Sequence, residues 1–309
     1  KPVEKNELGG SHIHANGSGA VDNEVGSEQE AFEAIGEFLS YLPQNVWQLP
    51  PVIESKDPTD RRDESLLSVI PRDRRHMYQI KEVINSVVDL NSFFEINPGY
   101  GESLVVGLAR LDGHSVGIMA NDTMHHGGAV NATASEKMMR FVDLCDTFHI
   151  PLLNLVDNPG FLIGTQAEEE GTVRLGSRAL MACYQASIPW VSVIIRRCYG
   201  VAGAGHGNAD GLNLRYAWPS ADWGSLPIEG GVQAAYKRDI ESSENPNTRR
   251  RELEDMLEQY RSPLRTAEAF GIEEIIDPRD TRPLLCDWVK QAYEILPSQL
   301  GPKSRTPRP

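Results

Sequence analysis

Cysteines are scarce in this sequence, and long apolar runs are missing. Only four cysteines occur in 309 residues, at positions 145, 183, 198 and 286, and no two form a C-x-x-C pair. This spacing indicates neither a disulfide framework nor a zinc site. We therefore expect a reducing compartment, either the cytoplasm or, in a eukaryote, the mitochondrial matrix. No apolar run approaches the roughly 18 residues of a membrane span, and the sequence predicts no secretory signal.

Positive charge is also in short supply. The chain has 30 Lys and Arg against 44 Asp and Glu, a formal net charge of −14. This balance argues against nucleic acid or an anionic membrane as the main partner. Two local basic clusters, at residues 72–75 and 249–251, are either sites for a phosphate-bearing ligand or solvated surface. No G-x-S-x-G elbow is present, which disfavours a hydrolase.

The first 69 residues are predicted to form an arm, one helix and a linker. Residues 1–27 are mostly small or polar. Ser27 can cap a helix over residues 28–42, with Glu30 three positions later. Its apolar stripe consists of Ala31, Phe32, Ile35, Phe38, Leu39 and Leu42. The prolines at 50–51 and the charged residues 56–64 indicate a linker, so the main folded domain is expected to span residues 70–309.

That domain is predicted to begin with a helix over residues 77–87 and a short strand at 93–96. Two strands, 104–111 and 115–120, flank Asp112-Gly113, a dipeptide typical of tight hairpins. Thr133 and Glu136 suggest a capping box at the start of the next helix. Apolar helical segments at 138–144 and 180–186 are expected to bury against another domain or subunit. Charged residues 248–259 and residues 284–296 predict two further helices.

A repeated unit dominates the centre of the chain. Ile150-Pro151 and Ile188-Pro189 each precede an apolar run, at 152–156 and 190–195, and each run leads to a turn and a helical segment. Continuous apolar runs predict an α/β fold with neighbouring parallel strands covered on both faces. The two turns, at 157–161 and 199–202, should then lie on one edge of the sheet, where ligands of such sheets bind.

The second turn is rich in glycine. It follows a predicted strand and precedes a segment that could form a helix. The first backbone N–H groups of a helix are unpaired, and such an arrangement binds anions. The simpler interpretation is that Gly200, Gly203, Gly205 and Gly207 only allow a helix to pack tightly on the sheet. The second copy of the unit favours a functional turn.

Several motifs resemble the C-terminal half of the carboxyltransferase (beta) subunit of biotin-dependent acyl-CoA carboxylases, the propionyl-CoA, acetyl-CoA and methylcrotonyl-CoA carboxylase family. In order, they are ELGGSHIH at 7–14, NPGY at 97–100, GHSVGIMAN at 113–121, DNPGFLIG at 157–164, RCYG at 197–200, AWP at 217–219 and IIDPRDTR at 275–282. The resemblance implies a crotonase-like ββα superhelix. It also implies that the family's N-terminal CoA-binding domain is missing from this chain.

The resemblance implies carboxyl transfer from carboxybiotin to the α-carbon of an acyl-CoA, with this chain supplying the biotin side. The implied cofactor is biotin on a separate carrier domain or subunit, CoA is part of the substrate, and no metal is expected. The implied partners are an N-terminal carboxyltransferase domain or companion chain and a biotin carboxylase or biotin carrier subunit, in a homo- or hetero-oligomer. A biotin-dependent acyl-CoA decarboxylase and a non-catalytic crotonase-fold assembly subunit stay open as alternatives.

Site residues follow from the same resemblance. The amides of Val201 and Ala202 would stabilise the charge on the ureido oxygen of biotin, and no side-chain base is assigned. The implied substrate- or biotin-binding residues are Tyr199, Gly200, Gly203, Ala204, His206, Asn158, Pro159, Gly160, Phe161 and His125. His125 and His206 have structural roles as alternatives, and Asp157 is expected to cap its turn. Many family members have Gly-Gly-Ala-Tyr at 200–203, so GVAG here predicts an altered wall of the acyl pocket.

Overall fold

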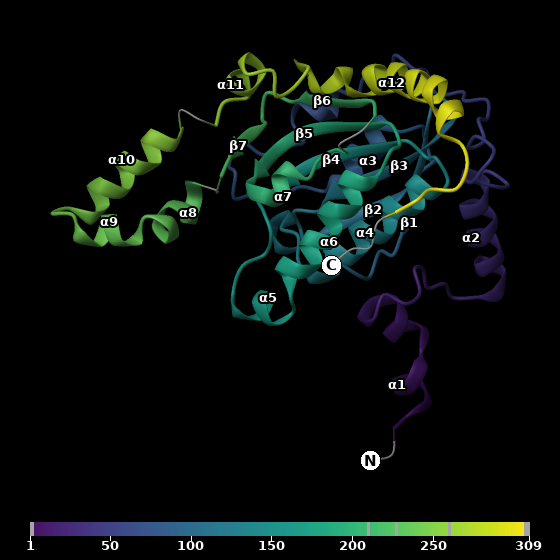
Figure 1. Cartoon of the computed structure of the whole chain (residues 1–309), viewed down its shortest axis with the longest axis horizontal. Coiled ribbons are helices and arrows are strands. Elements are labelled where there is room, and N and C mark those ends of the chain that lie inside the picture. Colours follow the sequence, from purple (N-terminus) through teal and green to yellow (C-terminus); the bar gives the residue numbers. More distant parts are fainter. Residues whose placement is uncertain (1–2, 209–210, 226–227, 259–260, 306–309) are drawn as a thin grey trace.

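The computed structural model describes residues 3–208, 211–225, 228–258 and 261–305. In these ranges the fold is built on one eight-stranded mixed sheet with helices on both faces (Figure 1). The strands are β1 (Phe94–Ile96), β2 (Leu104–Leu111), β3 (His114–Asn121), β4 (Leu152–Asn158), β5 (Trp190–Tyr199), β6 (Asn213–Ala217), β7 (Asp222–Gly224) and β8 (Glu274–Ile275).

Twelve α-helices and five short turns of 3₁₀ or π type accompany the strands in the described ranges. The helices are α1 (Lys5–Gly9), α2 (Glu28–Tyr41), α3 (Ile80–Val87), α4 (Ala132–Thr147), α5 (Thr165–Glu169), α6 (Thr172–Gln185), α7 (Gly200–Ala204), α8 (Ile228–Ala235), α9 (Lys237–Ser242), α10 (Pro246–Glu258), α11 (Pro263–Glu268) and α12 (Thr281–Ile295). Short 3₁₀ or π turns are η1 (Ile13–Gly17), η2 (Glu64–Leu67), η3 (His126–Gly128), η4 (Pro278–Asp280) and η5 (Leu296–Gln299).

The strand order is β1-β2-β3-β4-β5-β6-β8, with β7 paired to the end of β5. β1, β2 and β3 are antiparallel, and β3 to β6 and β8 are parallel. The prediction that residues 152–156 and 190–195 form neighbouring parallel strands is confirmed, since Leu152 pairs with Trp190 and Val156 with Ile194. β5 is longer than predicted and continues to Tyr199.

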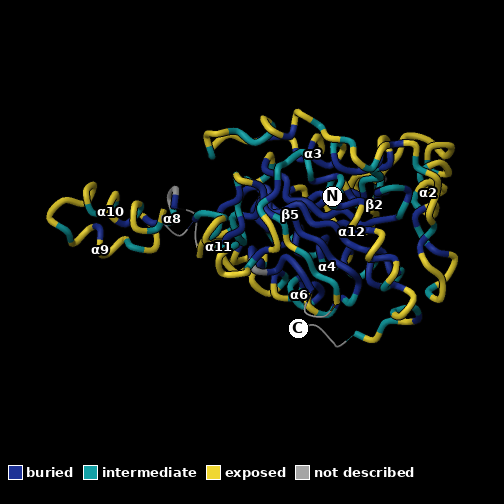
Figure 2. Tube along the Cα trace, turned by 90° about the horizontal axis from the view of Figure 1, so that it is seen from above, coloured by how far each residue is buried: buried dark blue, intermediate teal, exposed yellow. Residues whose placement is uncertain are grey.

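Alternate residues of each strand fill two cores. On one face, Val105, Leu155 and Val193 pack with α3 and α12. On the other face, Leu104, Leu152 and Trp190 pack with α4 and α6. Because both faces of the sheet are buried, its strands appear in the sequence as unbroken apolar runs. Figure 2 shows this buried interior in dark blue.

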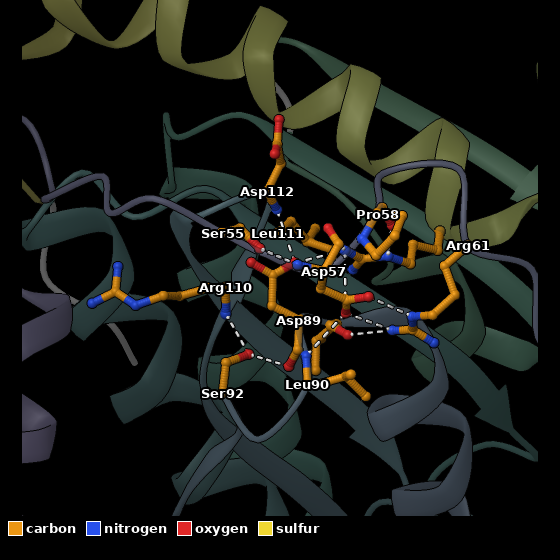
Figure 3. A network of polar contacts seen from close by, with 12 residues as sticks. Ser55, Asp57, Pro58, Arg61, Asp89, Leu90, Ser92, Arg110, Leu111 and Asp112 are labelled. Atoms are coloured by element: carbon orange, nitrogen blue, oxygen red, sulfur yellow. Dashed lines mark hydrogen bonds and ion pairs between the residues drawn. The ribbon is translucent and has the colours of Figure 1, made fainter.

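The hairpin turn forms as the sequence predicts. Asp112 and Gly113 both have positive φ, 48° and 76°, which is the type I′ geometry favoured by Asp-Gly. The carboxylate of Asp89 accepts hydrogen bonds from the N–H groups of Asp112 and Gly113, at 3.0 and 2.8 Å. Asp57 of the predicted linker accepts from Arg61 and from the N–H of Leu90 beside this turn (Figure 3). The division at residue 70 stays a prediction, although residues on its N-terminal side join this polar network.

One detail of the predicted helices, the capping box at Thr133 and Glu136, is wrong. α4 is capped by Asn131, whose side chain accepts from the N–H of Ala134, and not by Thr133. Glu136 instead accepts from the hydroxyl of Tyr100, at 2.5 Å. α4 and α6 pack against each other and against the sheet within this chain, so part of the apolar surface of segments 138–144 and 180–186 is already buried here. Burial of the rest against another domain or subunit stays a prediction.

Other apolar surface stays uncovered. Phe32, Ile35 and Leu39 of α2 are exposed, although Ser27 caps that helix as predicted. Helices α8 to α10 project from the body of the fold (Figure 1) around a small core of Ile228, Val232, Ile240 and Leu253. None of the helices in the described ranges combines the length and apolar character needed to cross a bilayer.

Candidate active site

Three turns meet at the carboxyl ends of β3, β4 and β5, as the parallel register requires. The turn after β4 pairs with the chain after β3: the N–H of Val130 donates to the carbonyl of Gly160 at 3.1 Å, and the N–H of Leu162 donates to the carbonyl of Val130 at 2.9 Å. A Cβ on Gly128 would lie only 2.7 Å from the carbonyl oxygen of Asp157. Because β4 and β5 are neighbouring parallel strands, the turns at 157–161 and 199–202 lie at one edge of the sheet, as predicted.

Asp157 joins these turns through two arginines. Its carboxylate is fully buried and accepts from Nε of Arg196 at 2.8 Å and from Nε of Arg197 at 2.6 Å. Arg197 also donates to the carbonyl of Gly127 at 2.6 Å, so one side chain links the ends of three strands. The expectation that Asp157 caps its own turn is wrong. Asn158 takes that role, because its side-chain oxygen accepts from the N–H of Gly160 at 2.8 Å.

The glycine-rich turn opens a short helix, α7. Gly200 has φ +62°, a left-handed conformation that suits glycine. Gly200, Val201 and Ala202 are the first three residues of α7, so their N–H groups have no acceptor within the helix. The side chain of Tyr199 does not cap them. Gly160 faces this turn, since a Cβ there would lie 3.9 Å from the carbonyl oxygen of Tyr199.

A cavity of about 310 Å³ lies beside α7. Predicted residues Gly200, Gly203 and His206 line it. Sequence reasoning missed the rest of its wall: Ile194, Cys198, Arg215, Trp223, Gly224, Thr266, Gly271 and Ile272. These residues come from β5, β6, β7, α11 and the segment after α11. No local motif signals that they converge, so only the strand order brings them together.

His206 lines this cavity with a ring held in one tautomer. Its ring is buried, with 5% exposure, and Nδ1 lies 2.9 Å from the side-chain nitrogen of Asn154. Because the amide nitrogen donates, Nδ1 accepts and the ring proton is on Nε2. Nε2 is buried without a hydrogen-bond partner among the described residues. Burial, with a smaller contribution from the positive charge of Arg215, lowers the pKa of His206 to about 3. The ring is therefore a neutral N–H donor at ordinary pH.

The thiol of Cys198, which also lines the cavity, is protonated and unreactive. Burial raises the pKa of this thiol to about 12. The thiol donates to the carbonyl of Gly203 at 3.2 Å, so it is not a nucleophile at neutral pH. Across the described residues, no group of three or more His, Cys, Asp or Glu could hold a metal ion. Among the described residues that line the cavity, none is an Asp or a Glu.

Four further predicted site residues do not line the cavity. Nδ1 of His125 is 3.5 Å from a carboxylate oxygen of Glu102 in a partly exposed loop, and His125 does not line the cavity. The ring of Phe161 packs on Gly176 of α6. Pro159 is partly buried between Asn158 and Gly160. The side chain of Tyr199 is buried, with 1% exposure, so the backbone of this residue is what it presents to the turn.

Two residues of α7 need separate mention. Gly203 lines the cavity, but a Cβ there would also approach the carbonyl carbon of Cys198 to 2.7 Å, which is a packing constraint. The side chain of Ala204 lies outside what the structure describes. The binding and catalytic roles of all these residues stay predictions.

Comparison with known proteins decides the family. The model of the family described as "Carboxyl transferase domain" matches residues 1–294. The chain belongs to the carboxyl transferase domain family. This carboxyl transferase domain is 39% identical over 281 residues to a "Propionyl-CoA carboxylase, carboxyltransferase subunit" of Haloferax mediterranei, covering 89% of this chain and 54% of that protein. It is 33% identical to the "Methylmalonyl-CoA decarboxylase subunit alpha" of Veillonella parvula, covering 91% and 54%.

A solved structure of the transcarboxylase 12S hexamer, with methylmalonyl-coenzyme A and methylmalonic acid bound, superimposes with a TM-score of 0.88 at 30% identity. The match covers all of this carboxyl transferase domain and 58% of that chain. The predicted crotonase-like α/β fold is thus confirmed. The chain spans about half the length of the relatives it matches.

Proposed function

We propose that this chain supplies the biotin-side half of a carboxyltransferase site, which moves a carboxyl group from carboxybiotin to the α-carbon of an acyl-CoA. The observation that carries the proposal is the first turn of α7, where the N–H groups of Val201 and Ala202 have no helical acceptor. They stand beside a cavity lined by their neighbours Gly200 and Gly203 and by His206. Family membership supports the same reaction class.

The cavity suits a compact, partly apolar ring system with a polar oxygen. Its volume of about 310 Å³ is at the small end of the roughly 300–1,000 Å³ found for small-molecule sites, and Ile194, Trp223 and Ile272 make it partly apolar. The described groups offered by α7 and His206 are donors. The ureido group of biotin has an oxygen that accepts such donors. When bound, carboxybiotin supplies the carboxyl group that is transferred.

The residues of this chain then act by stabilising negative charge through hydrogen bonds. The Val201 and Ala202 amides stabilise the negative charge that develops on the ureido oxygen. Such donors are effective because they are already oriented before the reaction, and removing one typically costs about 3 kcal/mol of barrier. His206 stays neutral because burial lowers its pKa to about 3, so it does not remove the α-proton of the acyl-CoA. No side-chain base is assigned to this chain.

The proposed partners follow from the incomplete length of the match. We propose that an N-terminal carboxyltransferase domain or companion chain binds the CoA part of the substrate, and that a biotin carboxylase or biotin carrier subunit delivers the cofactor. The solved 12S relative is described as a hexamer. The exposed Phe32, Ile35 and Leu39 of α2 offer this chain an apolar surface for assembly. The four cysteines are free and buried, which supports the cytoplasm or the mitochondrial matrix as the compartment.

A decarboxylase is the second candidate. The relative from Veillonella parvula is named a methylmalonyl-CoA decarboxylase subunit. Decarboxylation needs the same donors around the ureido oxygen, so the site geometry serves both directions. A non-catalytic assembly subunit is less well supported, because the α7 turn keeps its amide donors and contains no proline.

Reconstitution tests the proposal. The chain is combined with the N-terminal carboxyltransferase half of a relative, and transfer of an isotopically labelled carboxyl group is measured between carboxylated biotin derivatives and a panel of acyl-CoAs. Each acyl-CoA is assayed in both directions. We expect transfer only when both halves are present. Failure with every acyl-CoA in both directions, despite a stable complex, would overturn the proposal, and so would full activity of this chain alone.

A further inference from the structure

A second pocket, of about 290 Å³, gathers arginines from separated parts of the chain. Its wall consists of Arg74, Arg75, His76, Met77, Thr123, Gly127, Arg196, Arg197 and Arg261. It shares none of its lining residues with the cavity beside α7. One of the two basic clusters singled out in the sequence, residues 72–75, thus lies next to three arginines that no local pattern connects to it.

Two of the five arginines do not belong to an ordinary solvated surface. Arg196 and Arg261 are buried, with 2% and 7% exposure. Solvated arginines keep their guanidinium groups in water, whereas these two side chains form part of the pocket wall.

Positive charge exceeds negative charge around the pocket. Asp157 is shared by Arg196 and Arg197. Asp222, also fully buried, pairs with both Arg74 and Arg261. Five arginines therefore line a pocket in which two buried carboxylates each serve two of them. The exposed Glu258 adds one contact to Arg261, and the exposed Asp73 lies beside His76 and the backbone N–H of Arg75. In a chain of net charge −14, such a local excess is unusual and attracts anions.

Arg75 is the side chain with the most freedom to contact a ligand. It is exposed, it lines the pocket, and its guanidinium makes no hydrogen bond or ion pair with another described residue. The backbone around it is held in place, because the N–H of Arg75 donates to the carboxylate of Asp73 at 3.0 Å. Thr123, by contrast, is occupied: its hydroxyl accepts from the N–H of Tyr78 and donates to the carbonyl of Tyr78.

We propose that this pocket binds a phosphate or pyrophosphate group of a small-molecule ligand, with Arg75 as a direct contact. Several guanidinium groups around one concave site match the multiple oxygens and the double charge of a phosphoryl group. The volume admits a pyrophosphate or the phosphate-bearing end of a larger molecule and not a whole nucleotide cofactor. Two sources share this chemistry: the phosphates of CoA and a free phosphorylated metabolite.

Calorimetric titration of the purified chain with inorganic pyrophosphate, at low ionic strength, tests the proposal. We expect saturable binding by the unaltered chain. Arg75→Glu should weaken it by about tenfold or more, because it removes a charge-assisted contact and adds a like charge. Arg251→Glu is the matched control: it makes the same change of net charge at an exposed residue of α10 that does not line the pocket. It should change affinity less than about twofold, because Arg251 makes no contact with the pocket and a surface charge acts on it only through solvent of high dielectric constant.

Competition identifies the source. If CoA displaces pyrophosphate and 3′-dephospho-CoA does so less well, CoA is the natural ligand; if neither displaces it, the ligand is a free phosphorylated metabolite. Both results support the phosphate site. Absence of pyrophosphate binding at millimolar concentration, or equal loss in the Arg75 and Arg251 variants with unchanged melting temperatures, would overturn it. No biotin is present in this titration, so a failure here is separate from a failure of carboxyl transfer.

Discussion

The side-chain nitrogen of Asn154, on β4, donates to Nδ1 of His206 across 2.9 Å. This bond determines which ring nitrogen carries the proton, and it leaves the proton on Nε2 of a ring that lines the cavity beside α7. Because burial lowers the pKa of His206 to about 3, the ring stays neutral from mildly acidic to alkaline pH. The residue is thus unsuited to accept a proton from a ligand.

The buried neutral ring predicts acid sensitivity. A histidine has a pKa of about 6.5 when the chain is unfolded. Below that pH the unfolded state therefore binds a proton that the folded state does not bind. Stability should therefore fall as the pH drops from about 6.5 toward about 3. His206→Gln keeps a polar, hydrogen-bonding side chain without this titration. Between pH 8 and pH 5, the free energy of unfolding should fall by about 2 kcal/mol more in the unaltered chain than in the variant.

Urea unfolding at several pH values measures this difference. His125→Gln is the control, because its side chain is 42% exposed. That variant should keep the pH dependence of the unaltered chain. Parallel stability curves for the His206 variant and the unaltered chain between pH 8 and pH 5 would show that the ring is not held neutral by burial.

Ala202 separates a catalytic turn from a packing turn. Proline at this position removes the backbone N–H, whereas glycine keeps it and loses only a methyl group. In the reconstituted enzyme, Ala202→Pro should lower kcat by about 100-fold or more, and Ala202→Gly should retain most turnover. Ala202 is buried, so the melting temperature of each variant is measured alongside the rate. A folded proline variant with near-normal transfer would place the oxyanion donors elsewhere.

Asp157 should be important for stability because it balances two arginines at the ends of the central strands. Asp157→Ala leaves Arg196, which has 2% exposure, buried without its carboxylate. Breaking one side of a buried ion pair typically costs about 3–5 kcal/mol. Lys81→Ala removes the more exposed Lys81–Glu95 pair and should cost less than about 1 kcal/mol. Equal losses for the two variants in chemical unfolding would contradict the structural role given to Asp157.

Two glycines should respond in opposite ways to alanine. Gly113 has φ +76°, and a Cβ there would lie 1.8 Å from the carbonyl oxygen of Ile53. Gly113→Ala should destabilise the fold by more than about 1 kcal/mol. Gly36 lies within α2, and a Cβ there would meet no atom within 4 Å, so Gly36→Ala should stabilise by about 0.5–1 kcal/mol. Thermal unfolding of both variants checks the signs, and a stabilising Gly113→Ala would show that the hairpin turn tolerates a side chain.

The sequence by itself determined the hairpin turn and the central strands, because each depends on residues that are adjacent in the chain. Asp112-Gly113 determines the hairpin because both residues adopt positive φ. The apolar runs determine β4 and β5, and since parallel strands end at one edge, the meeting of the 157–161 and 199–202 turns followed from the strands alone. The prediction that Thr133 caps α4 was wrong because a second candidate, Asn131, lies two residues earlier. Asn131 and Thr133 can both cap, and the bond from Tyr100 to Glu136, 36 residues apart, is invisible to a local pattern.

Tertiary structure alone decided the chemistry of the buried groups. Asp157 was expected to cap its own turn, but it binds Arg196 and Arg197, because β5 lies beside β4 in the sheet. His206 owes its tautomer to Asn154, 52 residues earlier, and its low pKa to burial. The basic pocket joins Arg75 to Arg261 across most of the chain. Protonation and charge depend on distance and burial, and these depend on how distant segments pack, which residue order does not reveal by itself.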